Sequence, residues 1–248
     1  MKITSVNNDL VKETAKLLRG KYREESKLFL IEGEKGVQEA LDAGLNIERI
    51  FILEGIKGYP EDKVIETTEA VLSKISDAKS APKVIAIAHQ IPQDLEKIKK
   101  AKRVILLEGI KDAGNLGTIL RTASAFGIDG IVLYGDTVDL YNPKCVRSTV
   151  GCLWKTPVAQ IKDFETLENV FKSFEKIATL PLGINVVKLE NYIPSEKTLV
   201  MFGSEADGLS KELKDFATKN ITIEMAENVE SLNLSISVGV IAYKLKQV

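Results

Sequence analysis

The clearest indication of the fold is the stretch Arg103-Val-Ile-Leu-Leu-Glu-Gly-Ile-Lys-Asp-Ala-Gly-Asn-Leu-Gly-Thr-Ile-Leu-Arg121. Its apolar run Val104–Leu107 is typical of a strand that is buried on both faces of a sheet. Beyond a short polar loop, apolar side chains recur at helical spacing at Leu116, Ile119 and Leu120. The stretch therefore predicts a strand, a loop and a helix in succession, which is the building unit of an α/β protein.

Strand and helix patterns alternate on both sides of this unit. Further strands are predicted at 28–31, 50–53, 84–88, 130–134, 177–180, 198–202 and 220–223. Helices are predicted at 8–19, 36–43, 67–74, 116–126, 164–174, 209–217 and 232–246. In the second half of the chain, this alternation is typical of a mostly parallel sheet with helices on both faces. We therefore expect an α/β fold in two domains, at residues 1–90 and 103–248, joined by the charged, proline-containing linker 91–102.

The composition is that of an ordinary soluble globular protein. Hydrophobic residues make up 44% and charged residues 28%, and the formal net charge of -1 gives no global sign of nucleic-acid binding. Residues 1–30 are locally basic, with seven Lys or Arg and four Asp or Glu side chains. Such an excess suits contact with a phosphate backbone, and a solvated amphipathic helix is the alternative interpretation.

Two cysteines, Cys145 and Cys152, and one histidine, His89, are too few for a zinc site, so we expect no metal. Two thiols in a chain of this size favour a reduced, cytoplasmic setting. The first residues are polar and charged, which argues against a signal peptide. No apolar run approaches the roughly 18 residues of a membrane span, so we expect no membrane partner.

Three polar stretches follow apolar strands in the second half of the chain: Asn115–Arg121, Gly203-Ser-Glu-Ala-Asp-Gly208 and Ser231-Leu-Asn233. At such junctions free backbone N–H groups can hold a ligand, and we expect the three stretches to form one site. Asn115 is predicted to cap its helix, and Gly203 to let a ligand approach the backbone closely. The alternatives are a surface arginine at position 121 and an ordinary turn before a capped helix at 203–208.

Two familiar phosphate-binding loops are excluded. No two glycines are two positions apart, so the G-x-G-x-x-G loop of dinucleotide-binding proteins is absent. Gly203 and Gly208 have the spacing of a P-loop, but Leu209 stands where the phosphate-binding lysine is needed. A nucleotide-dependent enzyme of either class is therefore disfavoured. The helix predicted at 232–246 is apolar or small nearly all round, which suits either a subunit interface or an inner helix of a monomer.

Taken together, the three stretches resemble the three motifs of the SPOUT-class RNA 2′-O-ribose methyltransferases, in the SpoU (TrmH-like) branch. The resemblance rests on Asp112–Gly127, Gly203-Ser-Glu-Ala206 and Ser231-Leu-Asn-Leu-Ser235, and it covers residues 103–248 in the family's order and spacing. Between the first two motifs, Asn142-Pro-Lys144 and Ser148–Gly151 also resemble the family.

More loosely, Phe29-Leu-Ile-Glu-Gly-Glu-Lys35 resembles the family's small, ribosomal-protein-like (L30e-like) RNA-binding domain, which would occupy residues 1–90. Glu224 departs from the family pattern, because relatives often carry proline at that place.

The resemblance implies a fold, a cofactor and an activity. A small L30e-like α/β domain would precede a mostly parallel sheet whose chain is threaded into a trefoil knot that binds S-adenosyl-L-methionine. Relatives are homodimers. The reaction would move the methyl group to a ribose 2′-hydroxyl, in ribosomal RNA in the first place. The same reaction on transfer RNA, and a non-catalytic RNA-binding protein of this fold, are the alternatives.

The resemblance also implies roles for individual residues. The polar catalytic and structural positions of the family fall on Asn115, Arg121, Glu205, Ser231 and Asn233. Cofactor contacts fall on Phe202, Gly203, Ile223, Met225 and Leu232. In the RNA-binding domain, Lys12 and Arg23 are predicted to contact phosphates. The family's proposed base is Arg121, but a guanidinium is too basic to be neutral, so we hypothesise that it holds a phosphate and stabilises developing alkoxide.

Overall fold

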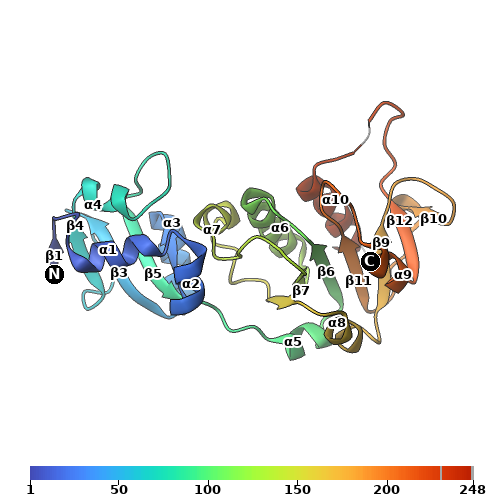
Figure 1. Cartoon of the computed structure of the whole chain (residues 1–248), viewed down its shortest axis with the longest axis horizontal. Coiled ribbons are helices and arrows are strands. Elements are labelled where there is room, and N and C mark those ends of the chain that lie inside the picture. The colour runs from blue at the N-terminus through green and yellow to red at the C-terminus, as the bar shows by residue number, and fades with distance from the viewer. Residues whose placement is uncertain (230, 247–248) are drawn as a thin grey trace. The chain divides into compact units, whose positions relative to one another are not determined.

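The computed structural model describes residues 1–229 and 231–246, and its two β-sheets belong to two separate units of the chain (Figure 1). The first unit comprises Met1–Pro92 together with Asp139–Trp154. The second comprises Gln93–Val138 and the chain from Lys155 onward. The prediction placed residues 139–154 in the second domain, whereas their contacts group them with the first unit. Among the described residues, no helix has the length and apolar character needed to cross a membrane.

The sheet of the first unit has five strands in the order β1-β4-β3-β5-β2. The strands are β1 (Lys2–Ile3), β2 (Leu28–Glu32), β3 (Ile47–Leu53), β4 (Val64–Thr67) and β5 (Val84–His89). Strand β5 pairs antiparallel with β2 and β3, and β4 pairs parallel with β1 and β3. The helices are α1 (Asp9–Lys16), α2 (Gly20–Ser26), α3 (Glu34–Asp42), α4 (Glu69–Lys74) and α7 (Pro143–Thr149).

The predicted strands at 28–31, 50–53 and 84–88 and the predicted helices of this unit are confirmed. Their local signals are strong: the Asn8 side chain accepts the N–H of Leu10 at the start of α1, and Gly44 has the positive φ of 70° that ends a helix such as α3. The apolar faces of these elements meet in one core, in which Val11, Phe51 and Ile85 are buried.

Residues 139–154 complete the first unit from a distant part of the chain. The Tyr141 ring packs on the Phe29 ring of β2 at 4.7 Å between centroids, and its hydroxyl is bonded to both the N–H and the carbonyl of Ile91. On α7, Arg147 Nη1 lies 2.7 Å from Glu32 Oε2 and also pairs with Asp77. This segment therefore contributes aromatic packing and an ion pair to a sheet whose strands end at least fifty residues before it in the chain.

The sheet of the second unit has seven strands in the order β10-β12-β9-β11-β6-β7-β8, and every neighbouring pair is parallel. The strands are β6 (Arg103–Glu108), β7 (Gly130–Tyr134), β8 (Val158–Ile161), β9 (Glu175–Thr179), β10 (Val186–Lys188), β11 (Thr198–Phe202) and β12 (Lys219–Thr222). The helices are α5 (Leu95–Lys100), α6 (Ala113–Phe126), α8 (Phe164–Val170), α9 (Lys211–Phe216) and α10 (Leu234–Lys246), with a 3-10 turn, η1 (Leu189–Asn191). The predicted α/β class with a mostly parallel second sheet is confirmed.

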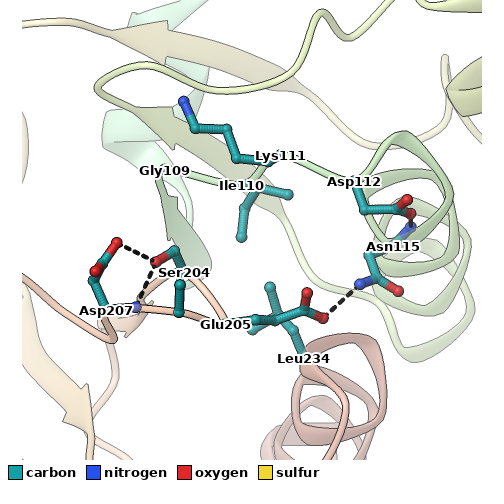
Figure 2. Close-up of a pocket in the computed structure, with 10 residues that line it drawn as sticks. Gly109, Ile110, Lys111, Asp112, Asn115, Ser204, Glu205, Asp207 and Leu234 are labelled. Carbon is teal, nitrogen blue, oxygen red and sulfur yellow. Dashed lines mark hydrogen bonds between the residues drawn. The ribbon is translucent and has the colours of Figure 1, made fainter.

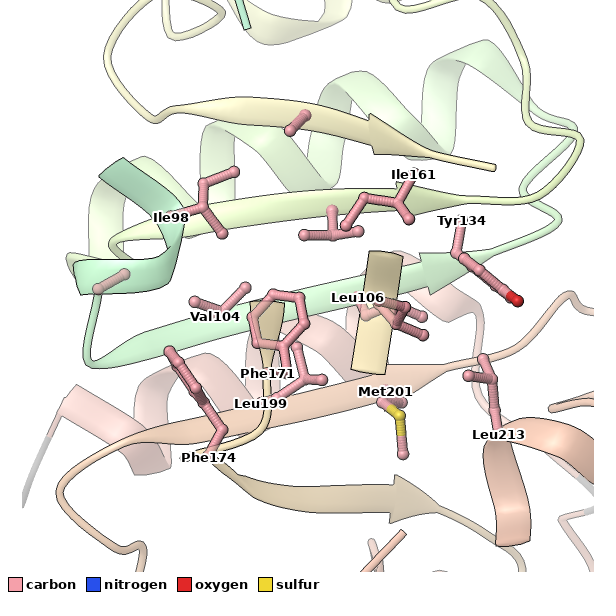
Figure 3. Packing of buried hydrophobic residues seen from close by; sticks show 14 of the residues in the cluster. Ile98, Val104, Leu106, Tyr134, Ile161, Phe171, Phe174, Leu199, Met201 and Leu213 are labelled. Carbon is pink, nitrogen blue, oxygen red and sulfur yellow. The ribbon is translucent and has the colours of Figure 1, made fainter. Parts of the chain in front are cut away.

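The core of this unit explains its continuous apolar strands (Figure 3). Val104 and Leu106 of β6 and Leu199 and Met201 of β11 are fully buried in one cluster. Ile98 of α5 belongs to the same cluster, so part of the predicted linker 91–102 packs in this core. The assignment of separate roles to residues 1–90, 91–102 and 103–248 stays a prediction.

The parallel register brings several strand ends to one edge of this sheet. Phe202 of β11 is level with Leu107 of β6, and Glu108 of β6 is level with Tyr134 of β7. Because the strands are parallel, the loops that follow β6 and β11 leave the sheet at this same edge. These are the loops that carry the first two sequence motifs.

Candidate active site

A cavity of about 180 Å³ lies between the two loops at the carboxyl edge of the second sheet (Figure 2). Its lining comes from the β6–α6 loop and the first turn of α6, from the loop after β11 and from the start of α10. The lining residues are Gly109, Ile110, Lys111, Asp112, Asn115, Ser204, Glu205, Ala206, Asp207 and Leu234. All three predicted motifs thus contribute to or adjoin one cavity.

Hydrogen bonds join the three motifs directly. Asn115 Nδ2 donates to Glu205 Oε1 at 2.6 Å, and Asn233 Nδ2 donates to Asn115 Oδ1 at 3.2 Å. A longer bond of 3.4 Å runs from Asn233 Nδ2 to Glu205 Oε1. Two amide donors therefore converge on one carboxylate oxygen, a charge-assisted arrangement that restrains the orientation of all three side chains. We call Asn115, Glu205 and Asn233 the amide–carboxylate cluster.

The prediction that Asn115 caps its helix is wrong. Helix α6 begins at Ala113, and Asp112 is its N-cap, whose Oδ1 accepts the N–H of Asn115 at 2.8 Å. Aspartate three residues earlier satisfies the free N–H groups of the first turn at least as well as asparagine would. Because Asp112 caps the helix, the Asn115 side chain is free to join the amide–carboxylate cluster.

The loop after β11 is closed on itself. The N–H of Gly208 bonds to the carbonyl of Ser204 at 3.0 Å, and the N–H of Asp207 bonds to Ser204 Oγ at 3.0 Å. A Cβ atom on Gly203 would lie 1.9 Å from the carbonyl carbon of Gly208. The prediction was that glycine at position 203 lets a ligand approach the backbone closely. In the structure, the backbone of the loop itself, at Gly208 and Leu209, packs against Gly203.

Arg121 and Ser231 stand outside the cluster. Arg121 is exposed on α6, nearly two turns beyond Asn115, and Ser231 is exposed ahead of α10. Neither side chain makes a hydrogen bond or ion pair with a residue that the structure describes. The guanidinium of Arg121 is thus available to an external anion.

The residues predicted to bind the cofactor lie at or after the ends of two parallel strands, or just before α10. Phe202 is buried at the end of β11 with Gly203 after it, Ile223 and Met225 follow β12, and Leu232 lies just before α10. Glu224, the departure from the family pattern, forms an ion pair with Lys188 of β10.

Several backbone donors in these segments are unused. The N–H groups of Gly203, Ile223, Met225 and Leu232 make no hydrogen bond with any described residue. Free N–H groups at strand ends can be satisfied by a bound ligand.

The prediction for Arg23 needs correction. Its side chain is only 3% exposed, its guanidinium pairs with Asp139 at 2.6 Å, and Nη1 donates to the carbonyl of Leu17. A buried, fully engaged guanidinium is not presented to RNA, so we assign Arg23 a structural role. Lys12 is half-exposed on α1, 3.3 Å from Asp9, and remains accessible. No local pattern around Arg23 indicates this pairing, because Asp139 lies 116 residues away.

Some charged lining residues, which lie in or beside the motifs, were not predicted as site residues. Asp112 caps α6, Asp207 accepts a hydrogen bond from Ser204 Oγ at 3.4 Å, and Lys111 pairs with Asp136. Apart from Lys111, the polar lining is dominated by the carboxylates of Asp112, Glu205 and Asp207 and the amide of Asn115 (Figure 2). The site therefore suits groups that donate hydrogen bonds, such as ribose hydroxyls.

Comparison with known protein families gives two matches. The model of the SpoU rRNA methylase family matches residues 102–243, and the model of an MRM3-like substrate binding domain matches residues 8–86. The first match contains all three motifs, and the second lies within the first unit.

Individual relatives cover nearly the whole chain. A Bacillus subtilis protein named 23S rRNA (guanosine(2553)-2′-O)-methyltransferase RlmP is 29% identical over 98% of this chain and 98% of its own length. A Synechocystis protein described as an uncharacterized tRNA/rRNA methyltransferase is 31% identical over 99% of this chain and 93% of its own. Among solved structures, the AdoMet-bound rRNA methyltransferase of Sinorhizobium meliloti aligns with a TM-score of 0.89 at 29% identity, over 100% of this chain and 97% of that one.

Proposed function

Because this chain belongs to the SpoU rRNA methylase family, we propose that it transfers the methyl group of S-adenosyl-L-methionine to a ribose 2′-hydroxyl of ribosomal RNA. The observation that carries the proposal is the amide–carboxylate cluster, in which Asn115, Glu205 and Asn233 bring three distant motifs into one site. The reaction in the name of the Bacillus subtilis relative supports the ribose 2′-oxygen as the acceptor.

The chain's own residues fit the proposed cofactor. The unused N–H groups of Gly203, Ile223, Met225 and Leu232 are suited to hold a polar ligand through the backbone. The half-buried side chains of Ile223 and Leu232 offer apolar surface for a purine ring. A neighbouring structure that holds AdoMet supports the same cofactor for this chain. When bound, the cofactor supplies a methyl group that its sulfonium already activates.

The protein must then align a ribose hydroxyl and lower the barrier to its attack. Alignment of two reacting centres supplies a large part of such a rate increase. In our proposal, the amide–carboxylate cluster fixes the wall of the cavity against which the ribose lies. Arg121 holds the neighbouring phosphate and stabilises negative charge that develops on the 2′-oxygen, with the proton passing to phosphate or water. Its exposure and lack of a partner among described residues support this role.

The same family resemblance predicts a homodimer, and α10 supports that proposal. Ile236, Val240 and Tyr243 recur at helical spacing, and their exposed fractions are 53%, 40% and 53%. An exposed apolar stripe of this kind is costly in water unless another surface covers it. We expect a dimer by light scattering, and a monomer after Val240→Asp. A trefoil knot and a cytoplasmic location stay further proposals from the family.

The proposal is tested by transfer of labelled methyl to unmodified ribosomal and transfer RNA pools, with cofactor binding measured by calorimetry in parallel. We expect binding, and label in ribosomal RNA. Label only in transfer RNA would favour the alternative substrate, which suits the broader tRNA/rRNA description of the Synechocystis relative. Absence of both binding and label would favour a non-catalytic RNA-binding protein.

A further inference from the structure

Glu108 ties the loop after β11 to the neighbouring strand β6. Its side chain stands at the carboxyl end of β6, and Oε2 accepts the backbone N–H of Ser210 at 2.7 Å in a partly buried setting. Ser210 is the N-cap of α9, where the loop ends. A hydrogen bond to an ionised carboxylate is about twice as strong as a neutral one, so this contact is well suited to hold the loop's end.

Tyr134 holds the same helix from the next strand. It is level with Glu108 in the β6–β7 register, and its hydroxyl donates to Glu212 Oε2 at 2.8 Å. Burial, followed by the hydrogen bond to the Glu212 carboxylate, raises the pKa of Tyr134, so the phenol stays a donor at neutral pH. Beneath these contacts, Leu209 and Leu213 are buried in the core. The start of α9 is thus fixed to two strands.

The loop between these fixed points has little freedom. Its first residue, Gly203, packs against the backbone of Gly208, and Ser204 bonds to Asp207 and Gly208. Glu205 is the residue of this closed loop that reaches Asn115 and Asn233. Glu108 itself does not line the cavity and is not part of the amide–carboxylate cluster. Any influence it has on the site must therefore pass through the loop.

We propose that Glu108 is a positioning residue for methyl transfer, which holds the loop so that the Glu205 carboxylate meets Asn115 and Asn233. This role rests on the proposed function for its catalytic consequence, but the loop geometry it predicts does not. The competing explanation is that Glu108 only stabilises α9. The two explanations differ in what happens to turnover when the hydrogen bond is removed but the fold survives.

The test compares Glu108→Ala with Glu108→Gln, whose side-chain oxygen can still accept the Ser210 N–H. We expect Glu108→Ala to lower kcat roughly 10- to 100-fold with little change in KM, since displacements near 1 Å can cost about 100-fold. Glu108→Gln should stay within about 3-fold of the wild type, because the acceptor oxygen is kept. Equal turnover of Glu108→Ala and the wild type would overturn the proposal.

Asp94 provides the matched control, because it caps α5 in the same unit by accepting the N–H of Lys97 at 2.8 Å. Asp94→Ala should lower the melting temperature by a similar amount and leave kcat within about 2-fold, as loss of one cap affects stability only. If Asp94→Ala and Glu108→Ala lower kcat alike, Glu108 is merely stabilising.

A double-mutant cycle tests whether Glu108 acts through Glu205. In a Glu205→Ala background, adding Glu108→Ala should lower kcat by less than about 2-fold, because residues that act through one contact are non-additive. Fully additive losses would show that Glu108 acts by another route.

Amide hydrogen exchange gives a readout that does not need turnover. Exchange at residues 203–210 should be about 10-fold faster in Glu108→Ala and unchanged in Glu108→Gln and Asp94→Ala. If Glu108→Ala does not fold, Glu108→Asp serves instead, since its carboxylate is withdrawn by one methylene. Unchanged exchange overturns the positioning role. Faster exchange in a protein that methylates no RNA would sustain the loop geometry while contradicting the proposed function.

Discussion

Asn115 Nδ2 lies 2.6 Å from Glu205 Oε1, although 90 residues separate them in the chain. Asn233 completes the arrangement, with its amide nitrogen 3.2 Å from Asn115 Oδ1. Glu205 lies in the loop after β11, Asn115 in the first turn of α6 and Asn233 just before α10, at the carboxyl edge of one parallel sheet. The contact explains why three short polar stretches act as a single site.

Asn115→Asp tests this contact, because it replaces an amide donor with a second carboxylate beside Glu205. We expect the free energy of unfolding to fall by about 1–3 kcal/mol at neutral pH, and methyl transfer to fall about 100-fold. Both should recover in part at lower pH, as one carboxyl of the pair takes up a proton. Asn8→Asp is the control, since Asp caps α1 as well as Asn does. Thermal melts and turnover that match the wild type for Asn115→Asp would contradict the arrangement.

Gly203→Ala should disrupt the loop itself. The added methyl would lie 1.9 Å from the carbonyl carbon of Gly208 and 2.1 Å from the nitrogen of Leu209, both backbone atoms that cannot simply rotate away. We expect a loss of about 1–3 kcal/mol in the free energy of unfolding, together with loss of activity. Gly183→Ala is the control, because its nearest atoms lie at 4.0 Å. Equal stability of the two variants, measured by denaturant titration, would mean that the loop does not close as described.

Substitution of Arg121, unlike that of Gly203, is expected to lower activity without lowering stability, since Arg121 is exposed and lacks a partner among the described residues. Arg121→Ala should leave the melting temperature and cofactor affinity unchanged but lower kcat by about 100-fold or more. Arg121→Lys keeps the charge but loses the planar fork, so an intermediate rate is expected. Near wild-type turnover in both variants would remove Arg121 from the mechanism.

Substitutions of Arg23 and Lys12 should affect different properties, the first the stability of the fold and the second the binding of RNA. Arg23→Met leaves Asp139 without its buried partner, and we expect the free energy of unfolding to fall by roughly 2–4 kcal/mol. The salt dependence of RNA binding should not change. Lys12→Gln should leave stability intact and reduce the slope of log affinity against log salt by about 1. A flattened slope in a fully stable Arg23→Met variant would restore the original phosphate-contact prediction.

Glu175 makes stability depend on pH in a defined direction. Burial alone would raise the pKa of Glu175, but hydrogen bonds from Lys219, Tyr192 and Ser195 outweigh burial and lower the pKa below its ordinary 4.5. A carboxylate with a lowered pKa stabilises the fold above about pH 4.5, and the contribution is lost as the pH falls through the folded-state pKa.

The difference in melting temperature between the wild type and Glu175→Gln should therefore be largest near neutral pH and shrink in acid. The exposed Glu168→Gln should follow the wild type at every pH. A difference for Glu175→Gln that is constant from about pH 7 to pH 3 would rule out this linkage.

The parts of the fold that sequence reasoning predicted depend on local signals. The apolar run Val104–Leu107 and the helical stripe at Leu116, Ile119 and Leu120 carry their own period, and both elements formed as expected. The place of the Asn115 side chain was harder to predict, because both Asp112 and Asn115 are good capping residues. Which of the two caps α6 depends on the residue at which the helix begins.

Contacts between distant segments could not be predicted from such local patterns. Nothing in residues 139–154 reveals that Tyr141 packs on Phe29 or that Asp139 pairs with Arg23. Periodicity reports which face of an element is buried but not which distant element covers it. Arg23 was therefore predicted to contact RNA because of its charge, whereas its burial gives it a structural role.

The most direct test of the central claim is the chemical position of the transferred methyl group. Ribosomal RNA methylated by the protein with labelled S-adenosyl-L-methionine is digested with alkali, which cleaves only next to a free 2′-hydroxyl. The proposed function predicts that the label is recovered in an alkali-resistant dinucleotide, and that Glu205→Ala strongly reduces its yield without removing it entirely. Label recovered in single nucleotides would place the methyl group on a base and contradict the proposed function.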